Sequence, residues 1–321
     1  ILSLQQRGFV LVLCSKNNPE DISEVLQNHP HQLLKNEHFV AQRINWLPKP
    51  DNLRSIADEL NLGLDSFIFV DDSSYECSAV KHSLPEVAVV QVPSRPAEIP
   101  ACLDALARLE IASLTREDLQ KTTMYAQERL RQSQLKGLTK TGGGIEDYLR
   151  SLNLRMTVGL DDISLVARLA QLTQKTNQFN LSTRRYSETD LIQTINNAKT
   201  FVFHFSLADI FGDSGVVGLA IVEGASDRNA RLDTFLMSCR VIGRMAEQAF
   251  LHSILRYLKS TGVDELSADY IPTRKNVLVE NFLPDNGFHK TADGTYVRNL
   301  ITTKHDLGDE FPIHIEGLVC K

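Results

Sequence analysis

The sequence predicts an α/β protein with two domains, a parallel sheet wrapped by helices and then an α+β domain with a mixed sheet. Residues 9–93 alternate apolar runs of strand length with longer helical patterns, which is typical of a parallel sheet. After residue 154, several strand patterns follow one another directly, which indicates hairpins. A chain of 321 residues also exceeds what one hydrophobic core usually serves. We expect the first domain at 1–112, a helical linker at 113–153 and the second domain at 154–321.

The composition is that of a globular protein and argues against several partners. Apolar residues make up 42% and charged residues 23%, and the net charge is −6 with no long run of one sign. We expect no nucleic-acid partner, because no basic face would neutralise a phosphate backbone. No apolar stretch has the length of a membrane span, so we expect no membrane partner and a cytoplasmic location. The five cysteines form no C-x-x-C pair, which argues against a zinc ribbon.

Each element of the first domain follows from its own pattern. A short helix is expected to end at Gly8. The apolar run from 9 to 14 predicts a central strand buried on both faces, and runs at 66–70 and 87–92 predict two more strands. Residues 52–62 have the apolar spacing of one helix face.

The second domain is expected to contain a mixed or antiparallel sheet. Its last long helix carries one apolar stripe, which core packing explains without a cofactor. The predicted elements are a strand at 155–160, helices at 161–178 and 189–197, strands at 200–205, 215–222 and 231–236, and a helix at 243–261.

Two loops at the carboxyl edge of the predicted parallel sheet carry groups suited to phosphate, and ligands of such sheets bind at this edge. Ser15 precedes Asn18 and Pro19, which suit a helix start whose free N–H groups attract an anion. Lys49 lies between two prolines just before a helix, which would hold its charge toward the crevice. A plain helix cap and a solvated surface lysine are the alternative interpretations.

A third loop places two carboxylates at the end of an apolar strand. Asp71 and Asp72 repel each other and resist burial, so a hard cation such as Mg²⁺ is the expected companion. Ordinary solvation of an exposed loop is the alternative. Ser73 and Glu76 have the spacing of a capping box, which explains them without a catalytic role.

Together, the three loops resemble motifs two to four of the haloacid dehalogenase (HAD) superfamily of phosphatases and phosphotransferases. The resemblance implies a Rossmann-like domain in which Ser15 and Lys49 hold a phosphoryl group while Asp71 and Asp72 hold Mg²⁺. In that superfamily a D-x-D motif after the first strand supplies the nucleophile, and no two aspartates of this chain lie two positions apart. We therefore expect the first strand and its nucleophile to precede Ile1.

Longer stretches in both halves resemble the FkbH-like proteins of polyketide biosynthesis, a group within HAD subfamily IIIC. The resemblance implies a dephosphorylating glyceryl transferase whose donor is 1,3-bisphosphoglycerate, a phosphorylated three-carbon compound. The glyceryl unit passes through a cysteine thioester to the phosphopantetheine thiol of an acyl carrier protein, and Asn17 is assigned to substrate binding. The stretches are residues 14–18, 43–53, 173–180 and 233–244.

Two cysteines compete for the thioester. Cys14 lies beside Ser15, where a thiolate would be near the acyl carbon, although a buried strand residue is the alternative. Cys239 ends a strand, adjoins Arg240 and precedes a helix start, which predicts a lowered thiol pKa. The sequence leaves this choice open.

The turn from Arg240 to Met245 resembles the R-x-x-G-x-G/A pyrophosphate loop of GNAT-type acyltransferases. The resemblance implies a GNAT-like second domain in which Cys239, Arg240, Gly243 and Arg244 contact substrate. Met245 departs from the pattern and puts acetyl-CoA binding in doubt. We expect a groove suited to a phosphopantetheine arm instead of acetyl transfer.

A polar segment of the second domain adds further candidates. Lys175 and Asn177, with Arg184 and Arg185 close behind, would form a cationic wall for the donor or for the carrier's phosphate. Solvent exposure of a helix end is the alternative.

Three functions are compatible with the sequence. The leading one is an enzyme, the Mg²⁺-dependent glyceryl transferase that loads an acyl carrier protein. The second is a general HAD small-molecule phosphatase with an acyltransferase-like domain. The third is an inactive module that only docks the carrier protein.

Overall fold

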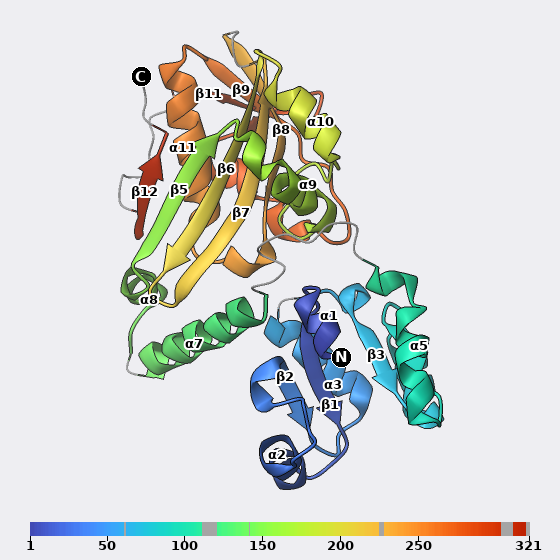
Figure 1. The fold of residues 1–321 in the computed structure, drawn as a ribbon. Helices are drawn as coiled ribbons and strands as arrows, with labels where there is room; N and C mark the ends of the chain where they lie inside the picture. The colour runs from blue at the N-terminus through green and yellow to red at the C-terminus, as the bar shows by residue number, and fades with distance from the viewer. Residues whose placement is uncertain (61, 111–120, 141, 225–227, 303–310, 319–321) are drawn as a thin grey trace. The chain divides into compact units, whose positions relative to one another are not determined.

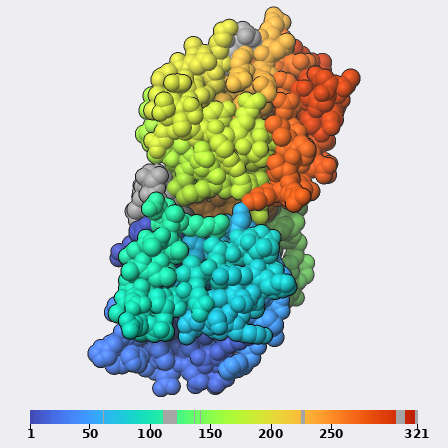
Figure 2. Space-filling model, turned by 90° about the vertical axis from the view of Figure 1, so that its right-hand side faces the viewer, coloured from blue at the N-terminus to red at the C-terminus, as the bar shows by residue number. Residues whose placement is uncertain are grey.

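The chain divides into two units, and each consists of one contiguous stretch of sequence. The computed structural model describes residues 1–60, 62–110, 121–140, 142–224, 228–302 and 311–318. The units are Ile1–Ala126 and Gln127–Lys321; in the ribbon (Figure 1) and in the space-filling view (Figure 2) the first runs from blue to green and the second from green to red. None of the helices in these ranges is long and apolar enough to cross a membrane.

The first unit contains two pairs of parallel strands. β1 (Leu11–Ser15) pairs with β2 (Phe39–Ile44), and β3 (Ile68–Asp71) pairs with β4 (Ala88–Gln91). The predicted parallel pairing is confirmed, but the two pairs do not join into one sheet, and no described strand pairs with the second edge of β1 or β3. All five residues of β1, predicted to be buried on both faces, are only half-buried, because one edge of the strand has no described neighbour.

Helices connect the strands of the first unit. α1 (Leu2–Gln6) is followed, as predicted, by Gly8, whose φ of 81° allows the chain to leave the helix. α3 (Lys49–Leu60) buries the predicted stripe of Leu53, Ile56, Ala57 and Leu60. The other helices are α2 (Pro19–Asn28), α4 (Ser74–Ser83) and α5 (Ile99–Asp104).

The second unit is a mixed sheet of eight strands with helices on both faces (Figure 1). The strand order is β10-β11-β9-β8-β7-β6-β5-β12. The predicted hairpins are present, since β5 to β8 pair in sequence as antiparallel neighbours, whereas β8–β9 and β12–β5 are parallel. The strands are β5 (Leu154–Leu160), β6 (Thr200–Asp209), β7 (Gly212–Glu223), β8 (Asn229–Met237), β9 (Glu265–Ala268), β10 (His289–Lys290), β11 (Tyr296–Asn299) and β12 (Ile313–Gly317).

Alternate residues of the large sheet build two cores. On β6, Phe203 and Phe205 share one core with α11, whereas Val202 shares the other with α9 and α10. α11 lies on one face of the sheet, and α9 and α10 lie on the other (Figure 1). The helices are α7 (Lys121–Lys140), α8 (Ile145–Ser151), α9 (Val166–Lys175), α10 (Glu188–Ile195), α11 (Ala246–Ser260) and α12 (Phe282–Asp285).

The stretch predicted as a helical linker contains α7 and α8, and most of it belongs to the second unit. Tyr148, Leu149 and Leu152 lie in the α11 core, which ties α8 to the sheet. The division into units falls at 126/127, inside α7, and residues 111–120 lie outside the described ranges.

Candidate active site

Side chains join the three loops that follow β1, β2 and β3. Each contact connects a different pair of these loops, so the carboxyl ends of the three strands meet although the two strand pairs share no ladder. The contacts are Lys49 Nζ to Asp71 Oδ2 at 2.5 Å, Lys16 Nζ to Glu76 Oε1 at 2.6 Å, and Trp46 Nε1 to Asn18 Oδ1 at 3.3 Å.

The Lys49–Asp71 pair is nearly buried. Lys49 is the first residue of α3, Asp71 is the last residue of β3, and their side chains are 10% and 9% exposed. The second carboxylate oxygen of Asp71 accepts the Ser73 N–H at 2.9 Å, and the Lys49 ammonium lies 5.5 Å from the centroid of the Phe69 ring. The alternative of a solvated surface lysine is therefore wrong, because both charges lie in a largely dry position that tolerates them only as a pair.

Lys16 and Glu76 form a second ion pair that the sequence analysis missed. The hydrogen bond with Glu76 raises the pKa of Lys16. Ser73 Oγ accepts the Glu76 N–H as a capping box requires, but the Glu76 carboxylate binds Lys16 instead of returning to Ser73. A lysine directly after Ser15, in a loop already suspected of binding phosphate, was the available signal.

The carboxylates near this pair fit part of a Mg²⁺ site. Asp72 is exposed, whereas Asp71 is engaged by Lys49. Among the described residues, no group of three or more His, Cys, Asp and Glu side chains could hold a metal. Mg²⁺ usually takes one or two protein carboxylates and completes its shell with water and phosphate oxygens, so Asp71 and Asp72 suit it as part of the ligand set.

The charges around this site do not favour phosphate on their own. Lys16 and Lys49 carry two positive charges, and Asp71, Asp72 and Glu76 carry three negative ones. The local sum is one negative charge, which would repel a phosphate dianion. A divalent cation would reverse this sign, so phosphate and metal are expected to bind together.

Cys14 and Ser15 are the last two residues of β1, and Asn17 lies in the loop that follows it. Ser15 is the last residue of the strand and is half-buried. Burial raises the pKa of the Cys14 thiol, and the opposing influence is mainly the charge of Lys49, which places the thiol near the ion pair. The Asn17 side chain makes a local hydrogen bond, in which its Oδ1 accepts the Asn18 N–H at 2.9 Å.

The predicted lowering of the Cys239 pKa is wrong. Burial raises the pKa of this thiol, and the nearby Arg240 charge lowers it by less. Arg240 lies in a 3-10 turn, where its Nε donates to Ser238 Oγ at 3.2 Å. For this half-buried thiol, the cost of partial burial outweighs the effect of a neighbouring cation.

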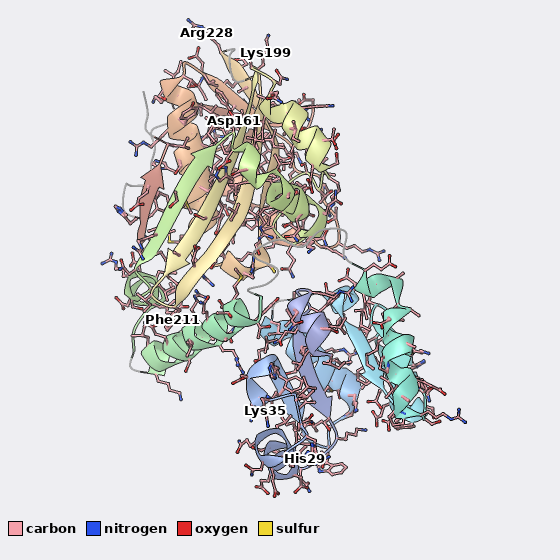
Figure 3. All side chains as sticks on the ribbon, in the orientation of Figure 1. His29, Lys35, Asp161, Lys199, Phe211 and Arg228 are labelled. Atoms are coloured by element: carbon pink, nitrogen blue, oxygen red, sulfur yellow. The ribbon has the colours of Figure 1, made fainter. Side chains whose placement is uncertain are left out.

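Arg244, predicted to contact substrate, belongs to a buried ion network. It is 5% exposed, and its Nη2 lies 2.6 Å from Glu128 Oε2 of α7. Beside it, Arg131 of α7 holds Asp209 through two hydrogen bonds of 2.6 and 2.8 Å. Figure 3 labels Phe211 at the β6–β7 turn next to α7, and Arg131 lies 5.9 Å from its ring centroid. The network attaches α7 to the sheet; within it the Nη1 of Arg244 makes no hydrogen bond and lies 3.5 Å from Asp209 Oδ2.

The predicted cationic wall is held mainly by internal contacts. Arg185 donates to the carbonyls of Thr173 and Thr176 and to Asn177 Oδ1, so it caps the end of α9. Arg184 pairs with the buried Asp233, and Lys175 is exposed at the end of α9. A shallow hollow of about 410 Å³ is lined by Arg185, Tyr186, Asp190, Gln193, Thr194 and Asn197.

The edge of β8 pairs with two different segments of the second unit. β9 pairs only with the first half of β8, and the chain's own segment at 179–181 occupies the edge beyond it. Leu181 N–H donates to Phe235 O, and Met237 N–H donates to Phe179 O, both at 3.1 Å. At the next turn Gly243 is exposed with φ 79°, and Met245 takes a left-handed conformation before α11.

Two groups of solved structures are similar to parts of this chain. The N-terminal part of BF1531 from Bacteroides fragilis, described as containing a phosphatase domain and complexed with Mg, is 34% identical over 35% of this chain, with a TM-score of 0.34. The chain spans 30% of the length of that structure. The ribosomal-protein-S18-alanine N-acetyltransferase of Escherichia coli is 13% identical over 47% of this chain and 97% of its own, with a TM-score of 0.37.

The PaiA N-acetyltransferase of Thermoplasma acidophilum, solved with coenzyme A, is 15% identical over 44% of this chain and 96% of its own, with a TM-score of 0.33. Each of these similarities covers less than half of this chain. No family model matches the chain, and no curated protein matches it.

Proposed function

We propose that the first unit is the catalytic part of an enzyme and binds the phosphoryl group of its substrate, together with Mg²⁺, between Lys49 and the Asp71–Asp72 pair. The observation that carries this proposal is the contact between Lys49 and Asp71 where the carboxyl ends of β2 and β3 meet. Ser15 and the free N–H groups at the start of α2 add donors on the side of β1.

The protein groups bind and orient the phosphate. The Lys49 ammonium holds a phosphoryl oxygen, and burial of its neighbourhood strengthens that attraction. Asp71 and Asp72 would hold Mg²⁺, which when bound neutralises charge on the phosphate oxygens.

The finer proposal is the glyceryl transfer implied by the FkbH-like resemblance. The Cys14 sulfur bonds to the acyl carbon of 1,3-bisphosphoglycerate, the bond from that carbon to the phosphate oxygen breaks, and phosphate leaves with the electron pair. The thiol proton passes to solvent. The carrier's phosphopantetheine thiol then attacks the thioester, and Cys14 recovers a proton. The position of Cys14 in β1, next to Ser15, supports this assignment over Cys239, which lies in the second unit.

Loading of a carrier protein tests the finer proposal. The protein is incubated with 1,3-bisphosphoglycerate, Mg²⁺ and an acyl carrier protein that bears its phosphopantetheine arm, and intact masses are measured. A glyceryl mass gain on the carrier is expected, and it should be lost in Cys14→Ala but kept in Cys239→Ala. A mass gain that survives Cys14→Ala would move the thioester to another residue.

A general small-molecule phosphatase is the second candidate, and one observation favours it. Burial raises the pKa of both candidate thiols, so neither is a ready thiolate at neutral pH. This candidate predicts free phosphate and an unmodified carrier in the same assay. An inactive docking module would instead bind the carrier equally well after Lys49→Ala and Asp71→Ala and release no phosphate.

A further inference from the structure

Large apolar side chains are exposed directly beside the Lys49–Asp71 pair. Two are aromatic, Trp46 and Tyr75, and one is aliphatic, Leu47. We call these three side chains the aromatic rim; they are 68%, 73% and 59% exposed. Trp46 and Leu47 precede Lys49 in the loop after β2, and Tyr75 follows Asp71 at the start of α4. Apolar surface left in water is unfavourable by about 25 cal/mol per Å², so three such side chains around one site call for a reason.

Both rings are held against the loop that follows β1. The Trp46 indole N–H donates to Asn18 Oδ1 at 3.3 Å, and the Lys16 ammonium lies 5.9 Å from the centroid of the Tyr75 ring. Lys16 is itself fixed by Glu76 at 2.6 Å. The rings are therefore positioned by the same three loops that carry Ser15, Lys49 and Asp71.

We propose that the aromatic rim binds the thiol-bearing arm of the acyl acceptor and guides it to the reacting carbon. This inference rests on the proposed acyl transfer. The phosphorylated three-carbon donor is charged and offers little apolar surface, so it leaves the rim unexplained. An extended arm with amide and methyl groups matches both the apolar rings and the polar groups of Asn18 and Lys16 beside them.

The size of the rim favours an arm over a protein surface. An aromatic side chain buries about 150–250 Å² when fully covered, so the rim offers a few hundred Å², whereas a stable protein partner covers about 800 Å² on each side.

Pantetheine, the free thiol arm, is the probe for this inference. Trp46 is the single tryptophan of the chain, so its fluorescence reports on the rim alone. We expect pantetheine to change the emission saturably, and Tyr75→Ala to weaken this binding about fivefold. With pantetheine as acceptor, Trp46→Ala should raise its KM about fivefold while kcat and the donor KM stay unchanged.

Leu33→Ala is the matched control, because Leu33 is 75% exposed in the same unit and away from the three loops. Equal pantetheine affinity in Tyr75→Ala and the parent would overturn the inference, as would an unchanged emission at any pantetheine concentration. If pantetheine is loaded normally by the Trp46 and Tyr75 variants, the inference fails and the proposed function stands. If the protein releases no phosphate from the donor, the proposed function fails, and the fluorescence titration still decides whether the rim binds the arm.

Discussion

Lys49 and Asp71 lie 22 positions apart in sequence, yet their side chains form an ion pair of 2.5 Å that is about nine-tenths buried. The contact connects the helix that follows β2 to the end of β3, and so it joins the two strand pairs of the first unit. In the proposed site the same ammonium would also hold a phosphate oxygen, so the pair would serve both stability and binding.

Breaking this pair should destabilise the protein strongly. Lys49→Met leaves the Asp71 charge buried without a partner and should lower the free energy of unfolding by about 3–5 kcal/mol, measured by urea denaturation. The double variant Lys49→Met, Asp71→Leu should lose less free energy of unfolding than the sum of the losses in the two single variants. Arg54→Met removes an exposed pair with Asp51 and should cost less than about 1 kcal/mol. Similar losses for Lys49→Met and Arg54→Met would contradict the account.

The two candidate thiols should react slowly at neutral pH. Burial raises the pKa of Cys14 and of Cys239, so the reactive thiolate becomes abundant only above the ordinary thiol range, near pH 8.5 and beyond. Alkylation by iodoacetamide, followed by peptide mass spectrometry, should still accelerate above pH 9 in the folded protein. In the urea-unfolded protein, the alkylation rates of both cysteines should reach their plateau at a lower pH than in the folded protein. A plateau below pH 8 for folded Cys14 would show an activated thiolate and contradict this.

Arg244 should act in stability instead of ligand binding. Arg244→Met removes a buried guanidinium that pairs with Glu128, while Arg131 keeps its own contacts with Glu128 and Asp209, and should lower the free energy of unfolding by about 1–3 kcal/mol. Arg240→Met, four positions away in the same turn, should cost clearly less because Arg240 is only half-buried. Thermal unfolding of both variants measures the difference. Equal effects would mean that the network is not what holds Arg244.

The second unit should lose stability as the pH falls, through His204. This side chain is 8% exposed in β6, its Nδ1 has no hydrogen-bond partner, and burial lowers its pKa. Unfolded histidine takes up a proton below about pH 6.5. The stabilising contribution is therefore present above that pH and is lost as the pH falls toward the folded pKa, by at most about 1.4 kcal/mol per pH unit.

Urea denaturation at pH 7.0 and 5.5 checks the histidine prediction. His204→Gln should make the two midpoints more alike than in the parent. His29→Gln, an exposed change at the end of α2 in the first unit (Figure 3), should leave the pH dependence as it is. An unaltered dependence in His204→Gln would assign the effect to another group.

Sequence patterns predicted the elements that have strong local signals. The stripe of α3 and the turn at Gly8 follow from helix periodicity and from glycine's freedom at positive φ, and both are confirmed. The strands β9 to β12 were missed, because they have two to five residues and no clear alternation. The exposure of β1 could not be predicted, since burial depends on the neighbours of a strand and its own sequence is apolar throughout.

The site was predictable only where a local sequence pattern indicated it. Polar residues after parallel strands indicated Lys49 and Asp71, because the carboxyl ends of such strands meet. The engagement of Arg184, Arg185 and Arg244 was not predictable, since each depends on a partner far away in sequence, as Arg244 does on Glu128. A cation that follows a motif is not thereby free to bind an anion.

Binding of inorganic phosphate, followed by isothermal titration calorimetry with and without Mg²⁺, tests the central claim most directly. The account predicts binding with Mg²⁺ and loss of at least tenfold in affinity after chelation with EDTA. The same loss is expected in Ser15→Ala and Asp72→Asn, which leave the Lys49–Asp71 pair intact. Phosphate affinity that is unchanged by EDTA and by both substitutions, or no phosphate binding by the parent protein with Mg²⁺, would contradict it.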